Sequence, residues 1–180
     1  MSLLIIGCGN MGGAMLAGWL AAGHDPMSFS ILDPGLNGAP DGVALYRSAD
    51  EVPGEHNAVL LGFKPHQLGD LAPRLQSLVA QGVAVHYLLA GLTLSQLKAA
   101  FPGVSEFVRV MPNLAARVNK SPVLLTQSGL DEAKRREVHA FYNALGTAVW
   151  LEDEGEFDLL TALTGSGPVF VYRFIDALAK

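Results

Sequence analysis

The sequence predicts an α/β fold with a doubly wound, mostly parallel sheet. Short apolar runs that are typical of buried strands recur along the chain, and segments with apolar residues at helical spacing lie between them. A glycine-rich turn also follows the first apolar run and opens the first helical segment. Strands that alternate with helices in this way form parallel sheets with helices on both faces.

Composition limits the class of protein before any motif is considered. Half of the 180 residues are hydrophobic, so a large core can form, and the net charge of −5 provides no basic surface for a nucleic-acid partner. The single cysteine, Cys8, excludes an intramolecular disulfide and fits a reducing compartment. We expect a cytoplasmic protein without a membrane partner, because we find no signal-peptide pattern and no apolar run long enough to span a bilayer.

The first predicted element is a strand over residues 3–6, which leads directly into a glycine loop. Gly7, Gly9 and Gly12 have the spacing G-x-G-x-x-G, and a helix is predicted to follow through Leu20. In a dinucleotide-binding turn the first glycine permits the tight bend, the second lets a pyrophosphate approach the backbone, and the third allows close packing of helix and strand. The loop therefore predicts a Rossmann-type dinucleotide site, although a glycine-rich turn without a ligand shows the same spacing.

The second predicted strand covers residues 28–32 and ends at Asp33. A carboxylate about 20 residues beyond the glycine loop commonly accepts hydrogen bonds from the adenosine ribose hydroxyls, which disfavours a 2′-phosphate. No arginine follows until Arg47, so the local sequence favours NADH over NADPH. Asp33 is equally well explained as a turn residue before Pro34 and Gly35.

The remaining elements continue the alternation. Strands are predicted over 43–46, 58–63, 83–90, 106–111, 121–127 and 147–151, and helices over 68–80, 94–100 and 131–145. Ligands of doubly wound sheets lie beyond the carboxyl ends of the strands, so the residues that close the strands should line one crevice. These residues are Gly7, Asp33, Lys64, Gly91 and the segment Met111, Pro112 and Asn113.

The last part of the chain differs in character and is predicted to begin a second domain. We place a dinucleotide-binding domain over residues 1–152 and a linker with the start of a helical domain over 153–180. The acidic run over 152–158 is interpreted as the surface of this linker. Ser166 is predicted to cap a final apolar helix, with Pro168 in its first turn. Such a helix needs a covering surface from another segment or another subunit.

Five motifs occur in order along the chain: IGCGNMGGAM, FKPHQL, LLAGLT, VRVMPN and TALTGSGPVFVY. With them the chain resembles the pyrroline-5-carboxylate reductases, the last enzymes of proline biosynthesis. The resemblance implies reduction of 1-pyrroline-5-carboxylate to L-proline with NADPH or NADH, and a homo-oligomer such as a dimer formed through the C-terminal helical region. A Gly- and Thr-rich loop that binds the substrate carboxylate in this family has no counterpart here. We therefore expect a truncated chain that binds the cofactor but is inactive alone.

The resemblance also implies roles for single residues. The glycine loop would hold the pyrophosphate. The FKP segment, residues 63–65, would run beside the cofactor ribose, and the dipeptide Ala90-Gly91 would approach the nicotinamide. The expected cofactor-binding residues, with Asp33 from the strand pattern, are Gly7, Gly9, Asn10, Met11, Gly12, Asp33, Phe63, Lys64, Pro65, Ala90 and Gly91. The expected catalytic residues are Asn113, Thr164 and Ser166.

Other interpretations remain open. A hydroxyacid dehydrogenase of the 6-phosphogluconate type shares the glycine loop, but it would need a catalytic lysine in a helix near the tail. A non-catalytic NAD(P)-binding module is the second alternative. The histidines are too scattered for a metal site, so no metal is expected. The proton donor is not identified, and His66 is one candidate. The family also usually has small residues where this chain has Tyr87, Leu88 and Leu89.

Overall fold

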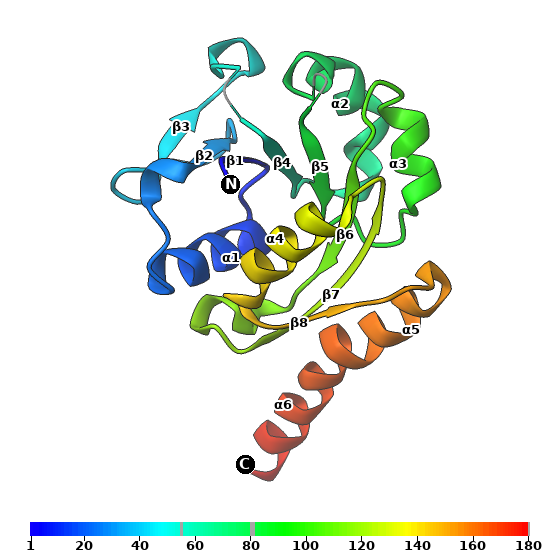
Figure 1. Cartoon of the computed structure of the whole chain (residues 1–180). Helices are drawn as coiled ribbons and strands as arrows, with labels where there is room; N and C mark the ends of the chain where they lie inside the picture. The colour runs from blue at the N-terminus through cyan, green and yellow to red at the C-terminus, as the bar shows by residue number, and fades with distance from the viewer. Residues whose placement is uncertain (55, 80–81, 180) are drawn as a thin grey trace.

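The computed structural model describes residues 1–54, 56–79 and 82–179. Within these residues, the chain forms an eight-stranded sheet in the order β3-β2-β1-β4-β5-β6-β7-β8 (Figure 1). Neighbouring strands are parallel except for the antiparallel pair β6 and β7. The predicted doubly wound, mostly parallel sheet is therefore confirmed. The strands are β1 (Leu3–Ile6), β2 (Phe29–Leu32), β3 (Ala44–Tyr46), β4 (Ala58–Leu61), β5 (Ala84–Tyr87), β6 (Phe107–Met111), β7 (Ser121–Ser128) and β8 (Gly146–Trp150).

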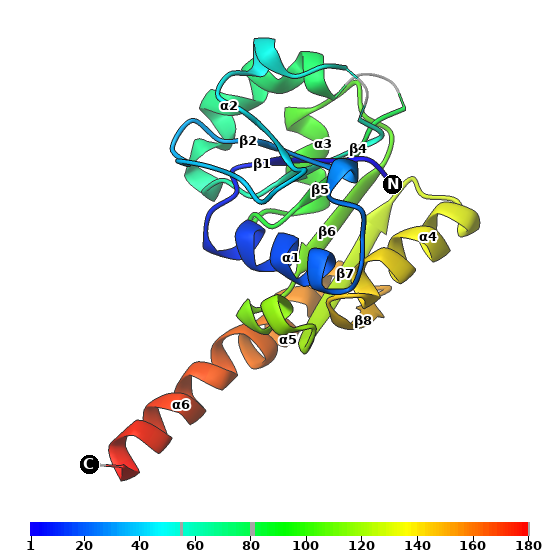
Figure 2. The same cartoon turned by 90° about the vertical axis from the view of Figure 1, so that its left-hand side faces the viewer.

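Helices cover both faces of the sheet. Figures 1 and 2 show α1 and α4 on one side and α2 and α3 on the other. The α-helices are α1 (Asn10–Ala21), α2 (Leu68–Leu75), α3 (Leu94–Ala100), α4 (Glu132–Asn143), α5 (Phe157–Thr161) and α6 (Gly167–Leu178). The 3-10 turns are η1 (Pro26–Ser28), η2 (Ala49–Glu51), η3 (Pro65–Gln67), η4 (Gln76–Leu78), η5 (Leu114–Val118) and η6 (Glu154–Glu156), and η7 (Ala162–Ser166) is a π-helical turn.

The central strands explain why the sequence shows continuous apolar runs. All four residues of β1, β2, β4 and β5 are buried. A parallel strand with helices on both faces has no solvent side, so apolar residues do not alternate with polar ones. Two separate cores result, one beneath α1 and α4 and the other beneath α2 and α3.

Trp19 of α1 is the largest side chain of the first core and is fully buried. Its indole stacks on Phe141 with ring centroids 4.5 Å apart, and its Nε1 donates to the Phe141 carbonyl across 3.0 Å. Gly18 lets α1 approach η5 closely, because a Cβ at Gly18 would lie 2.1 Å from the Ala116 carbonyl oxygen. These contacts fix α1, and with it the glycine loop, against α4 and η5.

Some predicted boundaries are wrong. Strand β5 ends at Tyr87 rather than at residue 90, and α2 ends at Leu75 and continues only as the 3-10 turn η4. The predicted helix ends at residues 80 and 180 lie outside the described residues.

Ser166 does not cap a helix, which corrects the prediction for the tail. Its backbone is helical (φ −89°, ψ −32°), and η7 joins α5 to α6 in one continuous helical segment. Pro168 has no N–H and its ring crowds the carbonyl four residues earlier, so a regular α-helix would be kinked or broken at this point. The chain accommodates the proline with a π-turn instead of starting a new helix.

Helix α6 lies apart from the rest of the fold. Figures 1 and 2 both show it projecting from the sheet, and none of its residues is buried. Its exposed large hydrophobic residues are Val169, Phe170, Val171, Tyr172, Phe174, Ile175 and Leu178. Among residues 1–54, 56–79 and 82–179, no helix combines the length and apolarity that crossing a membrane requires.

Candidate active site

The glycine loop and the turn after β4 are in close contact at the carboxyl edge of the sheet. Gly7 has φ +84°, and a Cβ on it would lie 2.8 Å from the Phe63 backbone nitrogen. A Cβ on Gly62 would lie 2.4 Å from the Gly7 carbonyl oxygen. Both positions therefore require glycine, and they bring the loop next to the FKP segment as the sequence predicted.

The N-terminus of α1 can accept an anion. Gly9 is its N-cap residue, no side chain caps the helix, and no acidic residue lies in its first turn. No other group comes within 4 Å of a Cβ placed on Gly9, so the space beside the loop is open. The unsatisfied first-turn N–H groups and the positive end of the helix dipole favour a phosphate at this point. The exposed Asn10 and half-buried Met11 begin this turn.

Asp33 lies at the end of β2 with its carboxylate against the glycine loop. Its Oδ2 accepts from the Cys8 N–H across 2.9 Å, and its Oδ1 accepts from the Gly35 N–H across 2.9 Å. Burial and the neighbouring carboxylate raise the pKa of the Cys8 thiol to about 11. Cys8 is therefore protonated at neutral pH, as expected for a small buried residue rather than a nucleophile.

Arg47 lies beside Asp33, which the sequence separation of the two residues did not suggest. Strand β3 pairs with β2, and the Arg47 guanidinium donates to the carbonyls of Asp33, Pro34 and Leu36. The Arg47 guanidinium therefore lies against the backbone of Asp33, at the position where a Rossmann-type sheet holds the adenosine ribose. The sequence analysis favoured NADH partly because no arginine lies close to Asp33 along the chain. In the folded chain Arg47 does lie close to Asp33, so this argument for NADH fails.

The segments expected beside the ribose and the nicotinamide follow β4 and β5 at the same edge. Lys64 is exposed, and its backbone N–H donates to Gln67 Oε1 across 2.9 Å. Phe63 and Pro65 are half-buried on either side of it. Ala90 and Gly91 are exposed, and Gly91 adopts φ +76°.

Two of the three expected catalytic residues, Asn113 and Thr164, are in contact at the end of β6. Asn113 Nδ2 donates to the Thr164 carbonyl across 3.0 Å, while Asn113 Oδ1 accepts from the Ala115 N–H across 2.9 Å. The Thr164 hydroxyl donates to the Leu160 carbonyl, and Ser166 is exposed at the end of η7. One Nδ2 hydrogen and one Oδ1 lone pair of Asn113 remain for a ligand.

A polar cluster around a buried arginine near these residues was not predicted. It consists of Arg109 of β6 with Glu154 and Asp158, which belong to the acidic run that the sequence analysis assigned to a linker surface. The available signal was a single arginine inside an otherwise apolar strand, VRVM, because a buried cation requires carboxylate partners elsewhere.

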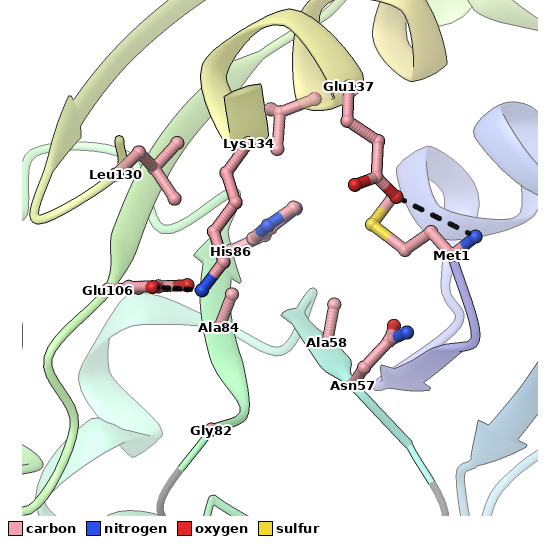
Figure 3. A pocket seen from close by; sticks show the side chains of 11 residues that line it. Met1, Asn57, Ala58, Gly82, Ala84, His86, Glu106, Leu130, Lys134 and Glu137 are labelled. Carbon is pink, nitrogen blue, oxygen red and sulfur yellow. Dashed lines mark hydrogen bonds and ion pairs between the residues drawn. The ribbon is translucent and has the colours of Figure 1, made fainter. Parts of the chain in front are cut away.

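A cavity of about 120 Å³ lies at the opposite, amino edge of the sheet (Figure 3). It is lined by His86, whose Nδ1 lies 2.7 Å from the Tyr142 hydroxyl and whose buried Nε2 has no hydrogen-bond partner in the part of the chain that the structure describes. An ion pair between Lys134 and Glu106 lies beside it. The described residues contain no group of three or more His, Cys, Asp or Glu that could hold a metal ion.

Proteins named pyrroline-5-carboxylate reductase are similar to the chain over nearly its whole length. The protein from Methanosarcina acetivorans is 30% identical over 182 residues, which cover 97% of this chain and 67% of that protein. The protein from Haemophilus influenzae is 27% identical over 187 residues, which cover 99% of this chain and 68% of that protein. The chain thus spans about two thirds of the length of these relatives. No protein-family model matches it.

Solved structures share the fold. The pyrroline-5-carboxylate reductase of Coxiella burnetii gives a TM-score of 0.88 at 24% identity, over 98% of this chain and 68% of that one. The pyrroline carboxylate reductase of Plasmodium falciparum, solved with NADP bound, gives a TM-score of 0.88 at 21% identity, over 99% of this chain and 67% of that one.

Proposed function

Because the chain belongs to the pyrroline-5-carboxylate reductase family, we propose that it reduces 1-pyrroline-5-carboxylate to L-proline with NADPH or NADH. The observation that carries this proposal is that two segments lie at the same edge of the sheet. The glycine loop follows β1, and the Thr164 segment is held at the end of β6 by Asn113. Since β1 and β6 point in the same direction, a dinucleotide on the loop extends along the edge toward Thr164.

The residues present fit a dinucleotide. Open space above Gly9 and an uncapped helix N-terminus suit a pyrophosphate, and Asp33 with Arg47 suits the polar ribose end. When bound, the reduced nicotinamide supplies a hydride, which adds to the C=N carbon of the protonated imine. The remaining work of the protein is to orient the imine and to exclude water. We assign the nicotinamide side to Ala90 and Gly91, and the substrate side to Asn113, Thr164 and Ser166.

We further propose a division into a dinucleotide-binding domain over residues 1–152 and a helical region from 153 onward. The exposed apolar residues of α6 support an oligomer in which a second copy covers this helix. A cytoplasmic location also stays a prediction, which rests on the single cysteine.

The function is tested by mixing the purified full-length gene product with NADPH or NADH and 1-pyrroline-5-carboxylate while the absorbance of the reduced nicotinamide is recorded. For the 180-residue chain alone we expect cofactor binding with little or no turnover. We expect the full-length product to cause loss of this absorbance together with formation of proline. Cofactor binding without turnover of the imine, combined with turnover of a hydroxyacid couple, would show that the chain is a dehydrogenase of another type. Binding without turnover of either substrate would favour a non-catalytic module.

A further inference from the structure

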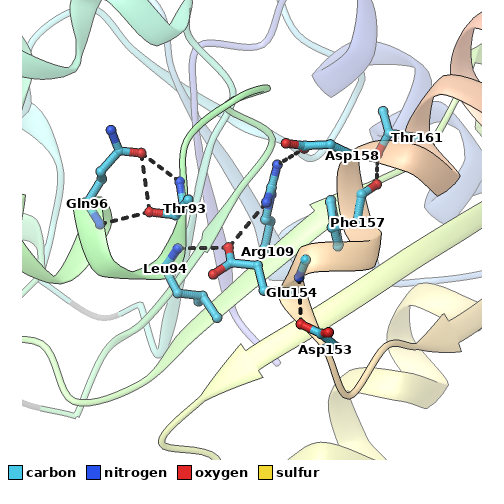
Figure 4. Close-up of polar contacts among 10 residues, drawn as sticks. Thr93, Leu94, Gln96, Arg109, Asp153, Glu154, Phe157, Asp158 and Thr161 are labelled. Atoms are coloured by element: carbon cyan, nitrogen blue, oxygen red, sulfur yellow. Dashed lines mark hydrogen bonds and ion pairs between the residues drawn. The ribbon is translucent and has the colours of Figure 1, made fainter.

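Arg109 is a buried cation held by two carboxylates from a distant part of the chain. The residue is 1% exposed, its NH1 lies 3.2 Å from Glu154 Oε1, and its NH2 lies 2.6 Å from Asp158 Oδ1. The guanidinium carbon also lies 4.1 Å from the centroid of the Phe157 ring. Figure 4 shows the guanidinium between the two carboxylates. We call Arg109, Glu154 and Asp158 the arginine clasp.

Glu154 connects the clasp to the loop expected beside the nicotinamide. The same Oε1 that accepts from Arg109 also accepts from the Leu94 N–H across 2.9 Å (Figure 4). Leu94 is the first residue of α3 and directly follows the loop that contains Ala90 and Gly91. A carboxylate at this helix N-terminus satisfies a backbone donor and complements the helix dipole. The position of the loop therefore depends on Glu154, and that of Glu154 on Arg109.

Asp158 connects the clasp to the turn expected beside the substrate. It lies in the first turn of α5, which runs directly into η7. Asn113, four residues after Arg109 along the chain, holds η7 at the Thr164 carbonyl. Arg109 in β6 and Asn113 just after β6 thus hold the segment from Glu154 to Thr164 at its two ends.

Stability alone does not account for this arrangement. Arg109 Nε and the Tyr87 hydroxyl are both buried without a hydrogen-bond partner among the described residues, and the two residues are register partners in β5 and β6. A buried ion pair contributes little net stability, and an unsatisfied buried donor reduces it further. An apolar side chain of similar volume would stabilise this position about as well, so stability does not explain why a charge is placed here.

We propose that Arg109 is a positioning residue that sets the separation between the nicotinamide loop, residues 88–93, and the substrate turn, residues 161–168. The proposal rests on the proposed function. It assigns no contact between Arg109 and either ligand. The clasp fixes the nicotinamide loop through Glu154 and the substrate turn through Asp158. A displacement of either segment is therefore transmitted to the other.

Hydrogen exchange measured by mass spectrometry tests the coupling without any turnover. The variant Asp158→Asn removes one carboxylate that is 73% exposed and has no direct contact with the nicotinamide loop. We expect it to raise the exchange rate of the peptide over 88–96 severalfold, in addition to that of α5. The matched control is Glu152→Gln in the same acidic run, where the side chain is 79% exposed and pairs with Arg135 instead. It should leave the 88–96 peptide unchanged.

Kinetics provides the functional readout. When Asp158→Asn and Arg109→Lys are made in the full-length gene product, we expect kcat for the imine to fall by about tenfold or more, because misplacement of reacting groups acts on the chemical step. The dissociation constant of NADPH, measured by its fluorescence, should stay within about twofold, since the glycine loop is untouched. A partial recovery in Arg109→Lys relative to Arg109→Met would support a role of the charge.

Unchanged exchange over 88–96 in Asp158→Asn would overturn the proposal, as would a kcat equal to that of Glu152→Gln. If the unmodified full-length gene product fails to reduce the imine, the proposed function fails instead. The exchange experiment still decides whether Arg109 couples the two segments.

Discussion

The side-chain amide of Asn113 donates to the backbone carbonyl of Thr164 across 3.0 Å, and this bond joins residues 51 positions apart. Pro168, four residues after Thr164, has no N–H that could donate to this carbonyl in an α-helix. Asn113 thus supplies a donor that the proline cannot provide. The MPN and GSGP motifs, which are distant in the sequence, meet through this one carbonyl.

We expect Asn113→Ala to loosen the π-turn and to lower the free energy of unfolding by about 1–3 kcal/mol, because the Thr164 carbonyl loses its side-chain donor. Chemical denaturation measures the loss, and hydrogen exchange over 160–168 locates it. Asn143→Ala is a matched control, since Asn143 Oδ1 accepts from the Ala148 N–H in another region. A control that opened η7 equally would contradict the local role of Asn113.

Gly9→Ala should separate cofactor binding from folding. The added methyl group meets no protein atom within 4 Å, so the midpoint of thermal unfolding should not fall. The same methyl group occupies the space expected for the pyrophosphate, and we expect the dissociation constant of NADPH to rise by about tenfold or more. Gly7→Ala is the contrasting variant, because its φ of +84° and its 2.8 Å approach to Phe63 predict lost stability as well. Unchanged NADPH binding in Gly9→Ala would place the cofactor elsewhere.

The charges at Asp33 and Arg47 should act in opposite directions on cofactor choice. Asp33→Asn removes a negative charge that repels a 2′-phosphate, so we expect the ratio of NADPH to NADH affinity to rise by roughly tenfold. Arg47→Ala removes the neighbouring cation and should lower the same ratio. Fluorescence titration with both cofactors measures it. If the affinities for NADH and NADPH change equally in both variants, neither charge discriminates between a hydroxyl and a phosphate at the 2′ position.

Burial of His86 predicts a stability loss in mild acid. Burial lowers the pKa of His86 from 6.5 to about 3, so the folded chain binds fewer protons at this site than the unfolded chain. The site therefore costs no stability above pH 6.5, and the folded state loses roughly 1 kcal/mol per pH unit as the pH falls from there toward 3. Urea denaturation at a series of pH values measures the slope.

The matched variant His86→Leu removes this titration. It should flatten the slope relative to the unmodified chain, whatever its stability at pH 7. Its absolute stability is a separate quantity, because the Tyr142 hydroxyl loses its partner. Parallel pH dependences in the two proteins would show that folding does not lower the pKa of His86.

The sequence predicted the parallel sheet and the glycine loop because both depend on local patterns, namely apolar runs and glycine spacing. It placed Asn113 at the edge that also carries the loop. It failed at Ser166, where Ser and Pro suggested a helix start, because the contact that stabilises the π-turn comes from Asn113, far away in the chain. Arg47 and Glu154 were also misjudged. Their partners, Asp33 and Arg109, become neighbours only through strand pairing and through the return of α5 to the sheet.

The exposed apolar face of α6 predicts association between copies of the chain. Phe170 and Phe174 are 74% and 64% exposed, and we expect Phe170→Glu with Phe174→Glu to convert an oligomer to a monomer in light scattering. Charged groups cannot be buried in an apolar interface without partners, whereas they are tolerated on a helix that faces water. Met27→Glu is the matched control, because Met27 is 82% exposed at η1, outside α6. An unmodified chain that is monomeric at all concentrations would show that a second copy does not cover this helix.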